Sequence, residues 1–303
     1  MVQFCSIKTL RIRLRTFKSG TGSANVIVMK TTIERLIAKI NDSALRVKKS
    51  KTETLWATIF GSGIVASFLV AVFIALIDRE TAPDFRKFDA GVERKQAFIS
   101  YFLPLIKQRN KELMVLREEL QELNDEQSQL SFFERRQVAQ LASTYAVENF
   151  SFEGPTDWNT LLRKIDVVPS SLALAQGANE SAWGTSRFAR EGNNFYGQWC
   201  FVEGCGVVPF AREKGANHEV ESFDSAKESV EGYIHNLNYH PAYAELRSIR
   251  AGLREREESV TGLKVAAGLK SYSERGDAYI EELSSMIRFN GLEEHDVIIN
   301  STD

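Results

Sequence analysis

The chain has 303 residues, 43% of them hydrophobic and 26% charged, which is ordinary for a globular protein and argues against wholesale disorder. Its net charge of −2 is unevenly spread, because residues 1–54 contain 12 Lys and Arg against 3 Asp and Glu, whereas the remainder is acidic. An acidic body argues against a nucleic-acid partner, since phosphate neutralisation requires clustered Lys and Arg on the folded domain.

Residues 1–53 form a basic N-terminal segment, which we expect to lie in the cytoplasm with Cys5 reduced. Residues 1–28 contain no acidic residue and show no clear period. Met29 opens a stretch with helical spacing of apolar residues, so translation starting at Met29 is an open alternative to Met1.

Residues 54–77 are 24 consecutive residues without a charge. At ~1.5 Å per residue such a helix spans ~36 Å, more than the ~30 Å hydrocarbon core of a bilayer. Lysines precede it, so the positive-inside rule predicts a single-pass membrane anchor with the N-terminus in the cytoplasm and everything after residue 78 on the other side. A cleaved signal peptide and a buried core helix are the alternatives, but the run is long for a signal peptide and lacks a small-residue cleavage site.

Residues 78–148 have the composition of helices and are expected to form a helical stalk. Five leucines share one face of a helix, at positions 113, 116, 120, 123 and 130. This seam is shorter than the ~3–4 heptads of a coiled coil, so it favours a helix pair that rests on the catalytic body over a dimer rod. Ser131 and Glu134 have the spacing of a capping box, which predicts a helix from there to Ala146.

Residues 149–157 are rich in turn formers and predict a linker. The following region, 158–292, is expected to be one α+β domain that is mostly helical with a small β-hairpin lobe, and 293–303 a C-terminal tail. Within the domain the pattern predicts helices over 158–165, 169–182 and 185–190. A loop and hairpin follow over 192–223, and further helices continue to residue 289. Ser225 and Glu228 predict a second capping box.

Four residues lie between Cys200 and Cys205 in WCFVEGCG. In an oxidising compartment this pair predicts a disulfide that closes a small loop at the base of the hairpin. No metal is expected, because zinc needs four ligands and the four histidines show no metal-ligand spacing. No cofactor is expected either.

The clearest candidate for a residue with a chemical role is Glu180. Pro169 suits the first turn of a helix and Gly184 is placed to end it in a left-handed cap, so Glu180 falls in the last turn. The negative end of the helix dipole and desolvation by large neighbours both raise the pKa of a carboxyl group there. The expected neighbours are the aromatic residues Trp183, Phe195, Tyr196 and Trp199.

A carboxyl group that stays protonated near neutral pH suits a general acid for glycosidic cleavage, and sugar rings stack on aromatic faces such as those of Trp183 and Trp199. The alternative is a solvated surface Glu180 beside core aromatics. The residues alone leave these two interpretations open.

The run LAQGANESAWGTSRFAREGNNFYGQW resembles the motif of bacterial glucosaminidases of glycoside hydrolase family 73. Within that family it is similar to the Bax-type membrane-anchored group, which is unrelated to the apoptosis regulator. The similarity extends through ERKQAFISYFLPLI, HEVESF, NLNYHPAYAELRSIRA and KSYSERGDAYIEEL.

The resemblance implies a lysozyme-like fold that hydrolyses the β-1,4 bond on the reducing side of N-acetylglucosamine in peptidoglycan, with Glu180 as the general acid. It places Tyr272 in the cleft as a catalytic residue with Tyr279 as its companion. Asn194, Phe195 and Gly197 correspond to the loop that shapes the substrate groove. Ser-Glu-Arg stands after Tyr272 where the family commonly has Ala-Thr-Asp, so the resemblance does not assign a role to that segment.

The resemblance also implies a second carboxylate on the hairpin, and spacing does not choose between Glu213 and Glu219. A carboxyl separation of ~5–5.5 Å suits a covalent nucleophile and ~6.5–9.5 Å suits inversion, while attack by the substrate's own 2-acetamido oxygen needs no protein nucleophile. We favour the last two routes. A muramidase or lytic transglycosylase on the same fold, and a non-catalytic scaffold that binds glycan, are the alternative functions.

Overall fold

The structure is a computed structural model in which the described residues are Ser67, 81–210, Arg212 and 215–296. The expected anchor (apart from Ser67), the N-terminal segment and the alternative start at Met29 therefore lie outside the described residues. Within the described part of the chain, no helix combines the length and the apolar character that crossing a bilayer requires. The described residues from 81 to 296 belong to one compact unit.

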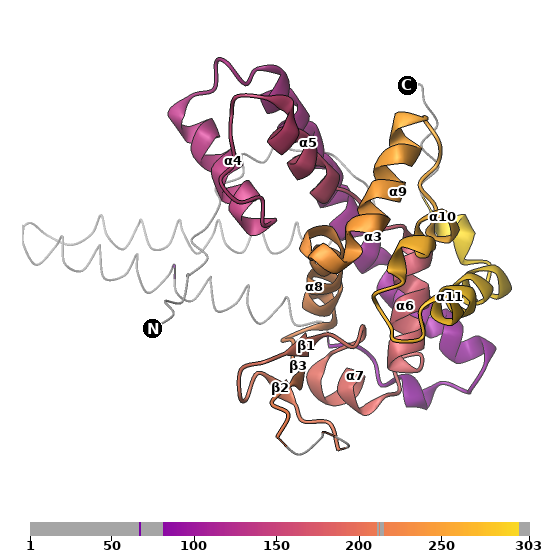
Figure 1. Cartoon of the computed structure of the whole chain (residues 1–303). Coiled ribbons are helices and arrows are strands. Elements are labelled where there is room, and N and C mark those ends of the chain that lie inside the picture. Colours follow the sequence, from indigo (N-terminus) through magenta and orange to yellow (C-terminus); the bar gives the residue numbers. More distant parts are fainter. Residues whose placement is uncertain (1–66, 68–80, 211, 213–214, 297–303) are drawn as a thin grey trace, which may run out of the picture. The chain divides into compact units, whose positions relative to one another are not determined.

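The unit is mostly helical with one small sheet, as the composition and periodicity predict (Figure 1). Its α-helices are α3 (Val92–Asp125), α4 (Phe132–Thr144), α5 (Pro155–Lys164), α6 (Ser170–Ser181), α7 (Arg187–Gly192), α8 (Ala226–Tyr239), α9 (Ala244–Glu255), α10 (Gly262–Val265) and α11 (Asp277–Phe289). Short 3-10 turns complete it: η1 (Phe85–Lys87), η2 (Pro241–Tyr243), η3 (Ala266–Leu269) and η4 (Leu292–His295).

Helix α3 is part of the compact unit, which differs from the helical stalk expected over 78–148. It contacts α6, α8 and α5, and Pro104 lies inside it without ending it. Leu113 and Leu120 of the leucine stripe are buried, whereas Leu130 lies beyond the end of the helix. The stripe therefore packs onto the body of the domain, and the described fold starts well before the expected boundary at residue 158.

Helix α4 begins with the predicted capping box: the Ser131 hydroxyl accepts from the Glu134 amide, and the Glu134 carboxylate accepts from the Ser131 amide at 2.7 Å. The expected linker 149–157 also packs onto the domain, because Phe150 and Phe152 lie edge-on against the buried Trp158. Helix α5 begins at Pro155, inside that expected linker.

Helix α6 lies in the middle of the fold, in contact with α3 on one side and α11 on another (Figure 1). All of its residues except Asn179 and Glu180 are buried, in keeping with a helix of small and apolar residues. At its N-terminus the buried Asp296 carboxylate accepts from the Ser171 amide, the Ser171 hydroxyl and the Gly262 amide at 2.7–2.9 Å. The domain therefore continues to Asp296, past the expected start of the tail at 293.

The sheet is small and has the strand order β1-β3-β2. Strand β3 (Glu219–Glu221) pairs antiparallel with both β1 (Trp199–Cys200) and β2 (Gly206–Val207). The register places Cys200 opposite Glu219 and Gly206 opposite Glu221. Sequence pattern predicts a hairpin here, and the structure adds a third strand to it. In Figure 1 the sheet and α7 lie together at one end of the unit.

The chain returns to helix at Ser225, whose hydroxyl accepts from the Glu228 amide. The expected capping box is only half formed, because the Glu228 carboxylate accepts from the Asp224 amide instead of the Ser225 amide. Helix α8 then packs against α3, and α9 to α11 complete the core around α6.

Candidate active site

Glu180 lies in the last turn of α6, as predicted, but the helix ends at Ser181, one residue earlier than expected. The cap in the left-handed region is Ala182 (φ 51°), followed by Trp183 (φ 57°) and Gly184 (φ 77°). The Ser181 hydroxyl accepts from the Gly184 amide at 2.8 Å and donates to the Gly177 carbonyl, which holds this turn together. Consecutive left-handed residues are uncommon outside glycine and cluster at functional sites. The sharp turn leaves Glu180 at the edge of the buried helix.

The Glu180 carboxyl group is half-buried and has two different neighbours. The Tyr279 hydroxyl donates to Oε1 at 2.8 Å. Oε2 faces Gly197, where an added Cβ would lie 3.4 Å from it. Burial raises the pKa of Glu180, helped by the negative charge of Glu282; hydrogen bonds from Tyr279 and Asn179 and the charge of Arg275 act against it without cancelling it. The direction agrees with the prediction, and burial is its main physical cause.

The four aromatic residues expected to shield Glu180 mostly point elsewhere. Phe195 is 1% exposed and packs edge-on against Phe102 with ring centroids 4.6 Å apart. Trp183 lies edge-on against Phe98 at 5.6 Å, with the Lys95 ammonium over its ring. Phe195 therefore supports the loop from the core and cannot touch a ligand in this structure, and the Trp183 ring contacts α3.

Trp199 and Tyr196 have opposite environments. Trp199 is 59% exposed on β1 and stacks on His218 with centroids 4.6 Å apart, which leaves an aromatic face open to solvent. Tyr196 is buried and stacks on Tyr233 at 4.0 Å, and its ring lies against Gly177 of α6. Of the predicted stacking residues, Trp199 is the one that can meet a sugar ring.

Tyrosines provide the environment of Glu180 instead. Tyr279 and Tyr272 stack with ring centroids 5.6 Å apart and planes 4° from parallel, and Tyr243 adjoins Tyr272 at 5.8 Å. Burial raises the pKa of Tyr279, Tyr272 and Tyr243, and the nearby charge of Glu180 raises each of them further. These phenols therefore stay protonated and serve as hydrogen-bond donors.

Tyr272 and Tyr279 have different roles from those expected. The Tyr272 hydroxyl donates to the Tyr196 carbonyl at 2.7 Å, so it secures the loop after α7. The residue that touches the Glu180 carboxyl group is Tyr279. The expected companion, Tyr279, therefore contacts Glu180 directly, whereas Tyr272 contacts the loop.

Asn194 is the internal brace of the loop between α7 and β1. It is 2% exposed; its amide nitrogen donates to the Gln198 and Glu221 carbonyls at 2.8 and 2.9 Å, and its oxygen accepts from the Tyr196 and Gln198 amides. Gly197 sits at the tip of this loop with φ +68°. Asn194 therefore shapes the loop without reaching solvent, and Gly197 is the part that faces Glu180.

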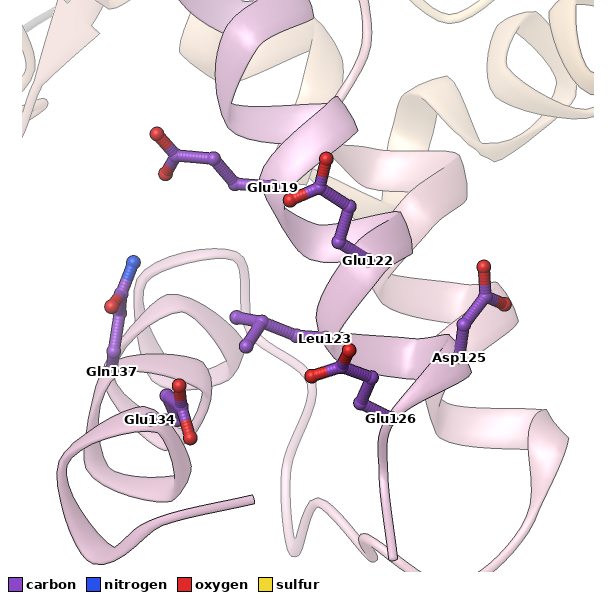
Figure 2. Close-up of a pocket in the computed structure, with 7 residues that line it drawn as sticks. All are labelled: Glu119, Glu122, Leu123, Asp125, Glu126, Glu134 and Gln137. Atoms are coloured by element: carbon purple, nitrogen blue, oxygen red, sulfur yellow. The ribbon is translucent and has the colours of Figure 1, made fainter. Parts of the chain in front are cut away.

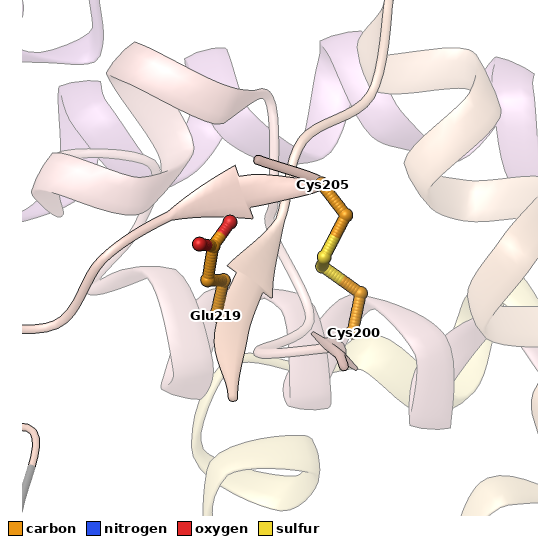
Figure 3. Close-up of side chains that lie close together, drawn as sticks. All are labelled: Cys200, Cys205 and Glu219. Carbon is orange, nitrogen blue, oxygen red and sulfur yellow. A yellow bond between two sulfur atoms is a disulfide. The ribbon is translucent and has the colours of Figure 1, made fainter. Parts of the chain in front are cut away.

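Glu219 secures the β lobe, where a second catalytic carboxylate was expected (Figure 3). Its side chain is 4% exposed, and its oxygens accept from the Gly204 and Gly206 amides at 3.2 and 2.8 Å. These two amides hold the pKa of Glu219 below its usual value. The other expected position, Glu213, lies outside the described residues.

Cys200 and Cys205 form the predicted disulfide, next to Glu219 (Figure 3). Their sulfur atoms and the Glu219 carboxylate lie within 4.8 Å of one another. Metal binding by cysteine requires the thiolate, and these two sulfurs are bonded to each other. The disulfide and the hydrogen bonds to Glu219 therefore hold the loop 200–206 in place.

Glu282 is a carboxylate near Glu180 that sequence reasoning missed. Its negative charge raises the pKa of Glu180, and it forms an ion pair with Arg275 at 2.6 Å. Glu282 follows Tyr279 by three residues on α11, so both lie on one face of that helix. That spacing is the signal that points to Glu282 once Tyr279 is placed in the site.

A hollow of about 460 Å³ lies between the end of α3 and α4 (Figure 2). Leu123 and Gln137 line part of it. The other lining residues are acidic: Glu119, Glu122, Asp125, Glu126 and Glu134. All of these belong to the α3–α4 corner, whereas Glu180 lies on α6. This hollow is separate from the candidate active site.

Comparison with known proteins identifies the class of domain. Residues 156–292 match the family model described as glucosaminidase, mannosyl-glycoprotein endo-beta-N-acetylglucosaminidase. The chain therefore carries a glucosaminidase domain. Over 208 residues it is 37% identical to Protein bax of Escherichia coli (strain K12), a match that covers 69% of this chain and 74% of that protein. The chain belongs to the Bax-type glucosaminidase family.

The chain is also similar to a solved structure, the catalytic domain of the autolysin Auto from Listeria monocytogenes. The sequence identity is 20% and the TM-score 0.31, with 58% of this chain and 96% of that chain covered.

Proposed function

We propose that this protein hydrolyses the β-1,4 glycosidic bond after N-acetylglucosamine in peptidoglycan, with Glu180 as the general acid. The observation that carries the proposal is the environment of Glu180: burial raises the pKa of this carboxyl group at the end of a helix, and its Oε2 faces the Gly197 loop. A general acid must hold its proton near the working pH and deliver it to the leaving oxygen. Membership of the glucosaminidase family supports the same reaction class.

The identity of the nucleophile that attacks the anomeric carbon follows from which carboxylates are free. Glu219 is committed to two backbone amides, and Glu282 is paired with Arg275. Attack by the substrate's 2-acetamido oxygen needs no protein nucleophile, so this route fits the described residues best. In it, the Glu282 charge helps Glu180 to keep its proton before bond cleavage.

The placement of the enzyme is part of the proposal. Residues 54–77 would anchor the chain in the inner membrane, with the catalytic domain in the periplasm, where peptidoglycan is accessible. The disulfide between Cys200 and Cys205 suits an oxidising compartment.

The direct test is Glu180→Gln, which keeps the shape of the side chain but removes the transferable proton. We expect a loss of about 10²–10⁴-fold in the release of reducing ends from purified peptidoglycan, the usual contribution of a general acid. The matched control is Glu281→Gln, an exposed carboxamide substitution on α11, which should keep wild-type activity. Undiminished release by Glu180→Gln would end the proposal.

The pH profile gives an independent check. Because a general acid works only while protonated, kcat/KM should fall as the pH rises through the raised pKa of Glu180. Mass spectrometry of the fragments should show N-acetylglucosamine at the new reducing end. N-acetylmuramic acid there, or its anhydro form, would reassign the protein as a muramidase or a lytic transglycosylase.

A further inference from the structure

A chain of three buried hydrogen bonds ends on Glu180. The Tyr233 hydroxyl of α8 donates to Gln176 Oε1 at 2.6 Å. Gln176 Nε2 donates to the Tyr279 hydroxyl oxygen at 3.0 Å, and the Tyr279 hydroxyl donates to Glu180 Oε1 at 2.8 Å. Gln176 and Tyr233 are 0% exposed, and Tyr279 is 2% exposed. Neither Gln176 nor Tyr233 touches the Glu180 carboxyl group in these bonds.

The Gln176 amide gives this chain a direction. A phenol has a single proton to donate, so each tyrosine can donate to one neighbour only. The hydroxyl of the fully buried Tyr233 needs an acceptor, since an unsatisfied buried donor is costly, and Gln176 Oε1 provides it. The amide nitrogen of Gln176 must then face Tyr279, and the Tyr279 proton is left to point at Glu180.

We infer that Gln176 and Tyr233 are positioning residues, which make Tyr279 a permanent hydrogen-bond donor to Glu180 Oε1 and so leave Oε2, on the Gly197 side, as the oxygen that carries the transferable proton. This inference deepens the proposed function and rests on it for its catalytic meaning. The direction of the chain itself is independent of that function. Oε2 faces Gly197 of the loop.

Other groups around Glu180 set the background for this effect. Asn179 of α6 donates a hydrogen bond to the Glu180 carboxyl group, and Arg275 and Glu282 act on it through their charges. The phenols that sense the charge of Glu180 are Tyr233, Tyr243, Tyr272 and Tyr279. Of these groups, Tyr233 and Tyr279 bond to Gln176, and both lose that bond when Gln176 is replaced.

Loss of the direction has a predictable sign. Without the amide of Gln176, the Tyr279 hydroxyl can rotate and accept a hydrogen bond from protonated Glu180. That bond stabilises the neutral acid, whereas the present one stabilises the carboxylate. Since a neutral hydrogen bond contributes modestly to net stability, the pKa of Glu180 should rise by about half to one unit.

The experiment is a ¹³C NMR titration of the Glu180 carboxyl carbon in the full chain, assigned by its disappearance in Glu180→Gln. Gln176→Leu should shift the midpoint upward by about half to one pH unit. Tyr233→Phe should shift it in the same direction, because the Gln176 amide then loses the bond that orients it. Tyr233→Phe keeps the ring that stacks on Tyr196, so it carries the test even if Gln176→Leu does not fold.

The matched control is Tyr145→Phe, which removes a hydroxyl from another buried tyrosine in the segment after α4. It should leave the midpoint of Glu180 unchanged. Folded Gln176→Leu and Tyr233→Phe variants with the wild-type midpoint would overturn the inference. If the midpoints shift as expected but wild-type protein releases no fragments from peptidoglycan, the positioning stands and the proposed function fails.

Discussion

At the scale of single residues, the site depends on one carboxyl group and the small residue that faces it. Glu180 is held on one side by Tyr279, and its other oxygen faces Gly197. Gly197 has φ +68°, a conformation that costs a residue with a Cβ roughly 1–2 kcal/mol. A methyl group there would also stand in van der Waals contact with Oε2, the oxygen that we infer to carry the transferable proton.

Gly197→Ala should therefore impair both stability and catalysis. We expect the free energy of unfolding to fall by roughly 1–2 kcal/mol, measured by urea titration, and kcat/KM to fall about tenfold to a hundredfold because the leaving group is misplaced. Gly291→Ala is the matched control, since Gly291 has a similar φ of +63° but nothing within 4 Å of an added Cβ. It should lose the same stability and keep its activity. Equal losses of activity in both variants would show that Oε2 is not involved.

Local sequence pattern predicts the position of Glu180 at the end of a helix, but it does not predict which rings surround it. Its helix-end position follows from local pattern, since Pro169 and the turn after Ser181 are encoded within a few residues. The direction of a ring is a tertiary property: Phe195 turns into a core built from Phe102 and Phe85, which lie 93 and 110 residues earlier in the chain. Tyr279 reaches Glu180 from 99 residues later in the chain, so spacing alone does not choose it over Tyr272.

At the scale of elements, α6 can be central because it is made of small residues that let neighbours approach closely. Gly177 is the extreme case, since an added Cβ would lie 3.1 Å from the Tyr196 ring. That ring has little room to move, because it is buried and stacks on Tyr233. The close approach also places the Tyr196 carbonyl where Tyr272 binds it.

Gly177→Ala should destabilise the protein, although alanine is the better helix former by about 1 kcal/mol. Overpacking of a tightly packed core typically costs about 1–3 kcal/mol, which outweighs that gain. Gly252→Ala in α9 is the matched control, since its Cβ would meet only the end of the flexible Arg256 side chain. Thermal unfolding should show a lower Tm for the first variant and an equal or higher Tm for the second. A higher Tm for Gly177→Ala would mean that Tyr196 yields easily.

Helices with local signals are the elements that sequence predicts well. The Ser131 capping box and the extent of α6 need only a few neighbouring residues to be recognised. The third strand was not predicted, because strands of two or three residues are too short to show a periodicity. The pairing of β3 with two partners across a loop is likewise not visible in the sequence. The start of α5 at Pro155 lies inside a stretch whose turn formers predicted a linker.

At the scale of the whole molecule, one buried charge cluster ties α3 to the rest of the domain. Asp166, between α5 and α6, is 2% exposed and accepts from Arg254 of α9 at 2.5 and 2.7 Å. Arg250 lies 3.5 Å from the same carboxylate and Arg117 of α3 lies 3.9 Å from it. The expected stalk is part of the fold for this reason as well as for its leucine stripe. A contact between residues about 50 positions apart in the chain, such as Arg117 and Asp166, cannot be recognised from sequence periodicity.

The cluster predicts how stability depends on pH. Burial alone would raise the pKa of Asp166, but the three arginines outweigh it and hold the pKa below the ordinary value. A carboxyl group with a depressed pKa in the folded state stabilises the protein above its unfolded pKa of about 3.9, and this contribution is lost as the pH falls through the folded value. The stability due to Asp166 should therefore stay constant from pH 7 to about 5 and decline only in stronger acid.

Asp166→Asn removes the charge and leaves the fully buried Arg250 without its counter-ion. Breaking a buried ion pair in this way costs about 3–5 kcal/mol, so the free energy of unfolding at pH 7 should fall by about that amount in urea titration. The difference from wild type should shrink as the pH falls below about 4, because Asp166 of the unfolded wild-type chain binds a proton there, whereas the folded-state carboxylate, with its lowered pKa, does so only in stronger acid. Glu258→Gln, at a solvated carboxylate that pairs with Arg256 and Lys264, should lower the free energy of unfolding far less, because solvent screens surface ion pairs. A cost for Asp166→Asn as small as that of the surface variant would mean that α3 is joined to the domain by apolar packing alone.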